Sequence, residues 1–258
     1  MKTSTICLLA ASAAAAAAPV AHAGPRVDYQ QVFTTPVPGQ SAGVDTRLLY
    51  KNPNDPKAKP IPVRREIFTF PEGTVFDGAG VPDCTAPDLE LQLMGDAACP
   101  PESRVIYSDG DTSVAGFDDS EQKLIVNGYD LPNGARIIGT AEGTPIHGVA
   151  HITNKGRVVT VDLPRSPGGP PDGESAIRRV HNISPQSDVD GHAYTRTPPT
   201  CPASGVWRFE AQFVFSDGAT EADSYDMPCR RSQQAVKGAH ARHHKKSHHR
   251  RRARKKRW

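Results

Sequence analysis

The sequence predicts an all-β fold, an immunoglobulin-like or related antiparallel β-sandwich with short helical turns. The clearest predicted strand covers residues 206–215, where apolar and polar side chains alternate along the chain. The apolar set is Trp207, Phe209, Ala211, Phe213 and Phe215, and the polar set is Arg208, Glu210 and Gln212. A period of two is typical of a strand with one buried face. Glycine and proline supply 46 of 258 residues, which suits short strands joined by many turns.

A hairpin is predicted directly after this strand. Asp217-Gly218 is a turn sequence, and residues 219–227 then return along the strand. A two-residue turn would place Cys229 opposite Val206. We expect this hairpin to form part of the core of the sandwich.

Further strands are predicted along residues 63–230, which we interpret as the β-sandwich body. They cover residues 63–70, 124–126, 135–141, 146–152, 157–163 and 176–183. Turn sequences separate several of them, for example Asn154-Lys-Gly156. The Pro/Gly-rich stretch 164–173 is a possible joint between two β subdomains.

Two segments depart from this pattern. Residues 24–62 are expected to be irregular apart from a short strand at 47–50, because several prolines remove backbone donors. Between Cys84 and Cys99, Thr85 as a cap, Pro87 in the first turn and Gly95 as a stop predict a short helix. The leucines at 89, 91 and 93 fit a strand equally well.

The first 23 residues are typical of a secretory signal peptide. Lys2 is followed by an apolar run at residues 6–18 and by the small-x-small sequence Ala21-His22-Ala23. A membrane anchor is less favoured, because the run is shorter than the roughly 20 strongly apolar residues of a span. The mature chain is therefore expected to begin at Gly24 and to be secreted, with no transmembrane span.

If the protein is exported, its cysteines are expected to form structural disulfides. Cys7 leaves with the signal peptide, and Cys84, Cys99, Cys201 and Cys229 remain. An even number of cysteines in an exported protein favours disulfides, of which three pairings are possible. We favour Cys84–Cys99 and Cys201–Cys229 because both are local. Zinc is disfavoured because no C-x2-C pair is present.

Scattered motifs over residues 63–229 resemble uncharacterised secreted β-rich proteins of high-GC Gram-positive bacteria. These motifs are Phe70-Pro-Glu-Gly73, Pro82-Asp-Cys84-Thr85, Ala98-Cys99-Pro100 with Ser103, Cys201-Pro202, Gly205-x-Trp207, Asp217-Gly218 and Pro228-Cys229. The resemblance implies export, paired cysteines and a β fold. It implies no activity and assigns no functional residue.

Charge divides the mature chain into an acidic body and a basic tail. Residues 24–229 carry 28 acidic and 17 basic residues, whereas 230–258 carry 13 basic residues and no acid. We expect residues 231–258 to be disordered and to bind polyanions. The basic residues assigned to this binding are Arg242, Lys245, Lys246, Arg250, Arg251, Arg252, Arg254, Lys255, Lys256 and Arg257. The expected partner is an anionic cell-envelope polymer, with lipid headgroups, nucleic acid and acidic polysaccharide as alternatives.

Catalytic and metal motifs are weak. No G-x-S-x-G sequence is present, and no catalytic residue is assigned. His147 and His151 are interpreted as solvent-facing histidines on a sheet, too far apart to share a metal. Weak metal candidates are Asp109 and Asp111, for calcium, and the tail histidines His243, His244, His248 and His249, for a transition metal. Otherwise no cofactor is expected.

Three functions follow, in order of preference. The first is an exported non-enzymatic β-sandwich protein, attached to a surface through its basic tail. The second is a secreted hydrolase of envelope or extracellular polysaccharide, with acids such as Asp188, Asp190 or Asp109 in a cleft. The third assigns the tail a nucleic-acid-binding or antimicrobial role.

Overall fold

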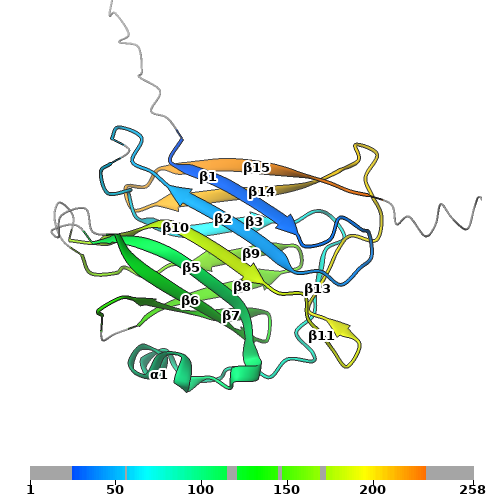
Figure 1. Ribbon diagram of the computed structural model, residues 1–258, viewed down its shortest axis with the longest axis horizontal. Helices are drawn as coiled ribbons and strands as arrows, with labels where there is room; N and C mark the ends of the chain where they lie inside the picture. Colours follow the sequence, from blue (N-terminus) through cyan, green and yellow to red (C-terminus); the bar gives the residue numbers. More distant parts are fainter. Residues whose placement is uncertain (1–24, 56, 115–120, 145–146, 169–172, 231–258) are drawn as a thin grey trace, which may run out of the picture.

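A computed structural model describes residues 25–55, 57–114, 121–144, 147–168 and 173–230 (Figure 1). Eleven of its strands form one antiparallel sheet in the order β1-β2-β10-β5-β6-β7-β8-β9-β3-β14-β15. Their bounds are β1 Val27–Phe33, β2 Val44–Tyr50, β3 Val63–Thr69, β5 Arg104–Val114, β6 Glu121–Leu131, β7 Gly134–Ala141, β8 Gly148–Lys155, β9 Val158–Asp162, β10 Ser175–Ser184, β14 Val206–Phe215 and β15 Thr220–Pro228. The prediction of an antiparallel all-β fold is confirmed. The predicted signal peptide (residues 1–23) and the tail 231–258 lie outside the described residues.

The smaller elements lie outside the eleven-stranded sheet. β4 (Val75–Phe76) pairs with β13 (Thr195–Arg196), and β11 (Asp188–Val189) pairs with β12 (His192–Ala193). Helix α1 (Asp88–Met94) is followed by two 3-10 turns, Gly95–Ala98 and Pro101–Ser103. Within the described ranges, no helix is both long and apolar enough to cross a bilayer.

The sheet folds over itself into a flattened barrel with two layers. β1, β2, β10 and β5 lie in front of β15, β14, β3 and β9 (Figure 1). The edge strands β1 and β15 meet, and polar contacts join them. The Glu221 carboxylate accepts hydrogen bonds from the backbone N–H groups of Arg26 (2.9 Å) and Val27 (3.2 Å), while Gln30 Nε2 donates to Tyr225 Oη (3.2 Å). These bonds protect two edges that would otherwise expose unpaired backbone groups.

The apolar face of β14 forms the centre of the core, as its alternation predicted. Trp207, Phe209 and Phe213 are at most 1% exposed. Their rings contact aromatic side chains of the opposite layer, for example Phe33 with Trp207 at a centroid distance of 5.5 Å and Tyr50 with Phe213 at 6.0 Å. Such contacts join the two layers through apolar burial.

The register of the predicted hairpin differs from the two-residue-turn expectation by one residue. Pro228, and not Cys229, lies opposite Val206. The reason is the turn: Phe215 N–H donates to the Ala219 carbonyl oxygen across the connection 216–218, in which Gly218 has φ +83°. A three-residue turn ending in a left-handed glycine is a common alternative to the two-residue type.

The expectation that residues 24–62 are irregular was wrong for much of this segment, since β1 and β2 both lie there. Inward positions alternate along both strands, but Gln31 on β1 and Thr46 on β2 are polar although they are buried. These two residues interrupt the apolar alternation that predicted the other strands. The prolines lie outside both strands, mainly in the β1–β2 connection (Pro36, Pro38) and in the connection from β2 to β3 (Pro53, Pro60, Pro62).

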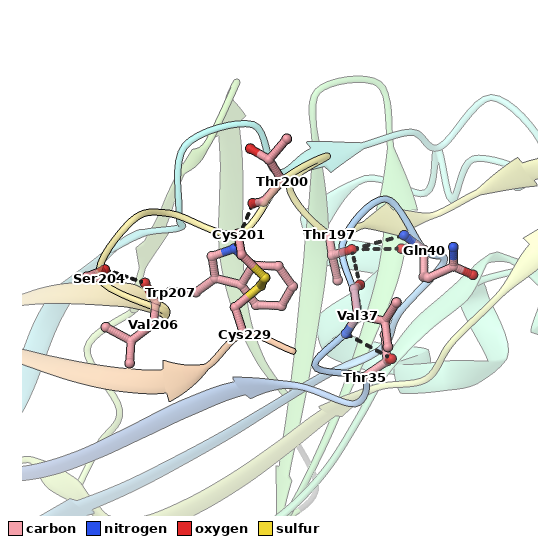
Figure 2. Close-up of a disulfide and its surroundings, with 10 residues drawn as sticks. All are labelled: Thr35, Val37, Gln40, Thr197, Thr200, Cys201, Ser204, Val206, Trp207 and Cys229. Atoms are coloured by element: carbon pink, nitrogen blue, oxygen red, sulfur yellow. Dashed lines mark hydrogen bonds between the residues drawn. A yellow bond between two sulfur atoms is a disulfide. The ribbon is translucent and has the colours of Figure 1, made fainter. Parts of the chain in front are cut away.

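Both predicted disulfides are confirmed, with Cα–Cα distances of 5.1 Å for Cys84–Cys99 and 5.6 Å for Cys201–Cys229. Figure 2 shows the second one beside Trp207, whose indole N–H donates to the Thr200 carbonyl oxygen (3.4 Å).

The segment preceding this disulfide is fastened to the β1–β2 loop. The Thr197 hydroxyl donates to the Val37 carbonyl oxygen (2.8 Å) and accepts from the Gln40 N–H (3.0 Å) (Figure 2). Because Thr197 follows β13 directly, these bonds fix β13 at one end of the barrel.

The predicted helix near the first disulfide is also confirmed. It ends at Gly95, which has φ +58°, but it begins after Pro87 and has no side-chain cap from Thr85. β9 precedes the possible joint at 164–173 and β10 follows it, and both strands belong to the same sheet.

Candidate binding cavity

A cavity of about 720 Å³ lies between the two layers of the barrel. Its apolar walls come from several strands and include Phe68, Phe70, Phe76, Ile137, Ile152 and Val161. This volume lies within the usual range for small-molecule sites, which are mostly apolar with a few polar groups. The cavity is therefore the candidate functional site.

Strand register places the cavity in one half of the barrel. It is lined by Val44 and Thr46 at the start of β2, whereas Tyr50 at the other end of β2 packs in the aromatic core. Residues of the segment after β4 and Thr195 of β13 line the end near the β1–β2 loop. We call that end the outer end, and the end toward Tyr50 the inner end.

A row of polar side chains crosses the inner surface of the front layer. Gln31 on β1 pairs with Thr46 on β2, and Thr46 pairs with Asn182 on β10, so the three lie side by side. All three line the cavity. Tyr29 Oη donates to Gln31 Oε1 (2.6 Å), which leaves the Gln31 amide nitrogen available.

Two buried hydroxyls of the cavity wall, those of Ser184 and Thr195, have no hydrogen-bond partner within the part of the chain that is described. Thr195 is 1% exposed. The Thr46 hydroxyl lines the same wall and likewise makes no side-chain hydrogen bond there. Buried polar groups are nearly always hydrogen-bonded, so unpaired ones in a cavity wall indicate a partner that enters the cavity.

Glu66 on β3 lies toward the inner end of the cavity and is 5% exposed. The Tyr50 hydroxyl donates to its Oε1, and Oε2 has no partner among the described side chains. Burial raises the pKa of Glu66 to about 7, because the charged carboxylate loses its hydration, although the bond from Tyr50 opposes that rise. Burial also raises the pKa of Tyr50, so Tyr50 remains the proton donor in this pair.

A second buried carboxyl, Asp130 on β6, lies toward the outer end and is 4% exposed. The Tyr194 hydroxyl donates to Asp130 Oδ1 (3.0 Å). Burial raises the pKa of Asp130 to about 6, and the nearby charge of Asp83 adds to the rise. The backbone of Gly78 packs against this carboxyl so closely that a Cβ there would lie 2.6 Å from Asp130 Oδ2.

The weak calcium candidates lie outside the cavity. Asp109 and Asp111 are on β5, and Arg179 on β10 binds them at 2.9 Å and 2.7 Å. The guanidinium of Arg179 thus pairs with both carboxylates that were considered as calcium ligands. Among the residues that the structure describes, no group of three or more His, Cys, Asp or Glu side chains could hold a metal ion.

The other acids singled out from the sequence are also not in the cavity wall. Asp188 belongs to β11, and Asp190 has φ +52° in the turn between β11 and β12. Neither lines the cavity, so the structure does not bring the acids considered for hydrolysis together there. The basic residues predicted to bind polyanions and the tail histidines lie in 231–258, outside the described residues.

The two internal histidines contact the helical segment and are not simply solvent-facing. His151 binds Asp88 of α1 through Nε2 (2.9 Å) and Arg136 through Nδ1 (2.6 Å). His147 bonds to Thr140 through Nδ1 (2.6 Å) and packs against Gly95. These contacts hold the helix on β7 and β8.

Comparison with known proteins gives no relative: no family, no curated protein and no solved structure matches the chain.

The sequence reasoning missed the cavity. Its only available signals were polar residues at inward positions of predicted or possible strands, such as Gln31, Thr46 and Glu66. A single polar residue on the otherwise apolar inner face of a strand can indicate that this residue lines an internal cavity.

Proposed function

We propose that this protein is an exported, non-enzymatic binding protein that holds a small organic molecule inside its barrel. The observation that carries the proposal is the cavity of about 720 Å³, with aromatic and aliphatic walls and unpaired buried polar atoms. A well-packed core leaves few voids larger than a water molecule, so a space of this size is a feature that stability alone does not require.

The test uses a neutral, environment-sensitive dye, N-phenyl-1-naphthylamine, and a variant that fills the cavity. Ala135 on β7 lines the cavity and is 2% exposed, so Ala135→Phe places a ring into the space. Ala222→Phe on the exposed face of β15 is the matched control. We expect saturable binding of one dye per chain in the parent and the control, and at least tenfold weaker binding in Ala135→Phe.

Equal dye affinity in Ala135→Phe and the parent would contradict the proposal, as would the absence of saturable binding. Circular dichroism of Ala135→Phe checks that the sheet is retained.

We also propose that the basic tail attaches the barrel to an anionic envelope polymer. The support is its composition: 13 basic residues and no acid over residues 230–258, beside a body with a net charge of −11. Cations that neutralise a polyanion release its counterions, so such binding weakens as salt increases.

Pelleting with bacterial cell walls at low and high salt tests the attachment. The full chain should pellet at low salt and be released at high salt, whereas a 24–236 truncation should stay in solution. A variant with the ten tail Arg and Lys residues named above changed to Gln is the matched control and should behave like the truncation. Equal pelleting of all three proteins would end the tail proposal and leave the cavity proposal intact.

A further inference from the structure

The ionisable side chains of the cavity wall are all potential anions at neutral pH, apart from one tyrosine. Glu66, Asp77, Asp83 and Asp130 line the cavity, and among its described lining residues there is no Lys, Arg or His. Among the described residues, Asp77 is the one acid of this wall that contacts a basic side chain: its carboxylate bonds to His192 Nδ1 outside the cavity (3.0 Å). A wall of one sign focuses a negative potential into the space that it encloses.

At the inner end, Glu66 lacks a partner that would balance its charge. Tyr50 supplies one neutral hydrogen bond, and the neighbouring wall includes Phe68 and Val161. Burying a carboxylate without a countercharge is costly, and buried charges are normally paired. The unused oxygen of Glu66 and the unpaired hydroxyl of Thr46 can both accept hydrogen bonds.

The rest of the wall does not offer the ligand set that a bare metal ion needs. Within the described chain no three metal-ligating side chains come together, and the walls around Glu66 carry aromatic and aliphatic groups. An occupant that satisfies both the acceptors and the apolar walls needs a donating cation and an apolar body.

We infer that the cavity binds an organic amine, with its ammonium group on Glu66 and its apolar body along Phe68, Phe70 and Phe76. This inference rests on the proposed function, since it specifies the ligand class of the same cavity. Asp83 and Asp130, which also line the cavity, add to the negative potential that attracts the cation.

The test compares three indole compounds that differ only in the end group of the side chain. Tryptamine carries an ammonium, tryptophol a neutral hydroxyl and indole-3-acetate a carboxylate. Binding of each to the full-length protein is measured by isothermal titration calorimetry at pH 8. We expect tryptamine to bind at least tenfold more tightly than tryptophol, and indole-3-acetate to bind most weakly. The basic tail cannot produce this order, because it would favour the carboxylate.

Two variants locate the charge preference. Glu66→Gln keeps the size of the side chain and an acceptor for Tyr50, so it should bind tryptamine and tryptophol with affinities within about threefold. Glu90→Gln removes a carboxylate from the exposed face of α1 and should keep the parent preference. Ala135→Phe should weaken all three compounds.

The outcomes separate the two proposals. Equal affinity for tryptamine and tryptophol in the parent, with both lost in Ala135→Phe, would overturn the amine inference and retain the binding cavity. A tryptamine preference that survives Glu66→Gln would overturn the assignment of Glu66. Failure of all three compounds and of the neutral dye to bind would overturn both proposals.

Discussion

The buried carboxyl of Glu66 should make the stability of the protein fall as the pH rises. Burial raises the pKa of Glu66 from 4.5 to about 7 in the folded chain. A difference of one in pKa between the folded and unfolded states corresponds to about 1.4 kcal/mol. The native state therefore holds a proton that the unfolded state has released, and the free energy of unfolding decreases between about pH 4.5 and pH 7. At pH 8 the buried carboxylate of Glu66 should therefore lower the free energy of unfolding by about 3 kcal/mol.

The Glu66→Gln variant tests this reasoning. Glutamine has no charge to bury, and its carbonyl oxygen still accepts from Tyr50, so the variant should match the parent near pH 4.5. At pH 8 it should be more stable than the parent by about 2 to 3 kcal/mol, after allowance for a weaker bond from Tyr50. The measurement is urea unfolding followed by tryptophan fluorescence at several pH values from 4 to 8.

Glu90→Gln is the control, because Glu90 is exposed and should leave the pH profile unchanged. A difference between Glu66→Gln and the parent that does not change with pH would refute the reasoning. If the parent were more stable than Glu66→Gln at pH 8, the predicted direction of the effect of Glu66 on stability would be refuted.

Three further predictions concern the framework. Replacing Cys201 and Cys229 together by Ala should lower the free energy of unfolding by about 3 to 4 kcal/mol, because the bridge closes a loop of 28 residues; a loss below about 1 kcal/mol in thermal unfolding would contradict this. Phe213→Ala should lower the free energy of unfolding by about 3 to 5 kcal/mol, since the ring is fully buried. In urea unfolding, Phe213→Leu should lower it by less than half as much. Glu221→Gln should speed amide exchange at Arg26 and Val27 at least tenfold, because their acceptor loses its charge. Unchanged exchange at both amides would show that the β1–β15 contact does not depend on this carboxylate.

Local features of the sequence sufficed for several elements. The alternation from Trp207 to Phe215 predicted β14, because a strand with one buried face selects apolar residues at every second position. The short spacings between cysteines predicted both disulfides, because neighbouring segments meet at a small cost in chain entropy. Gly95 predicted the end of α1 because its left-handed conformation suits glycine.

The strand β1 shows why other elements were missed. Its inward positions are Val27, Tyr29, Gln31 and Phe33, and the buried Gln31 conceals a regular alternation. Gln31 is polar because it lines the cavity and accepts from Tyr29. The cause of the missed strand is therefore the same as the cause of the missed site.

By itself the sequence determined the antiparallel β class, the two disulfides, the short helix and the separation of acidic and basic residues. Each depends on residues close together in the chain or on composition. Only the tertiary structure decided that β1 and β15 meet, that Gln31, Thr46 and Asn182 form one row, and that Glu66 faces a cavity without a countercharge. These features arise from the pairing of distant strands, which depends on how the whole sheet closes, and no local pattern encodes it.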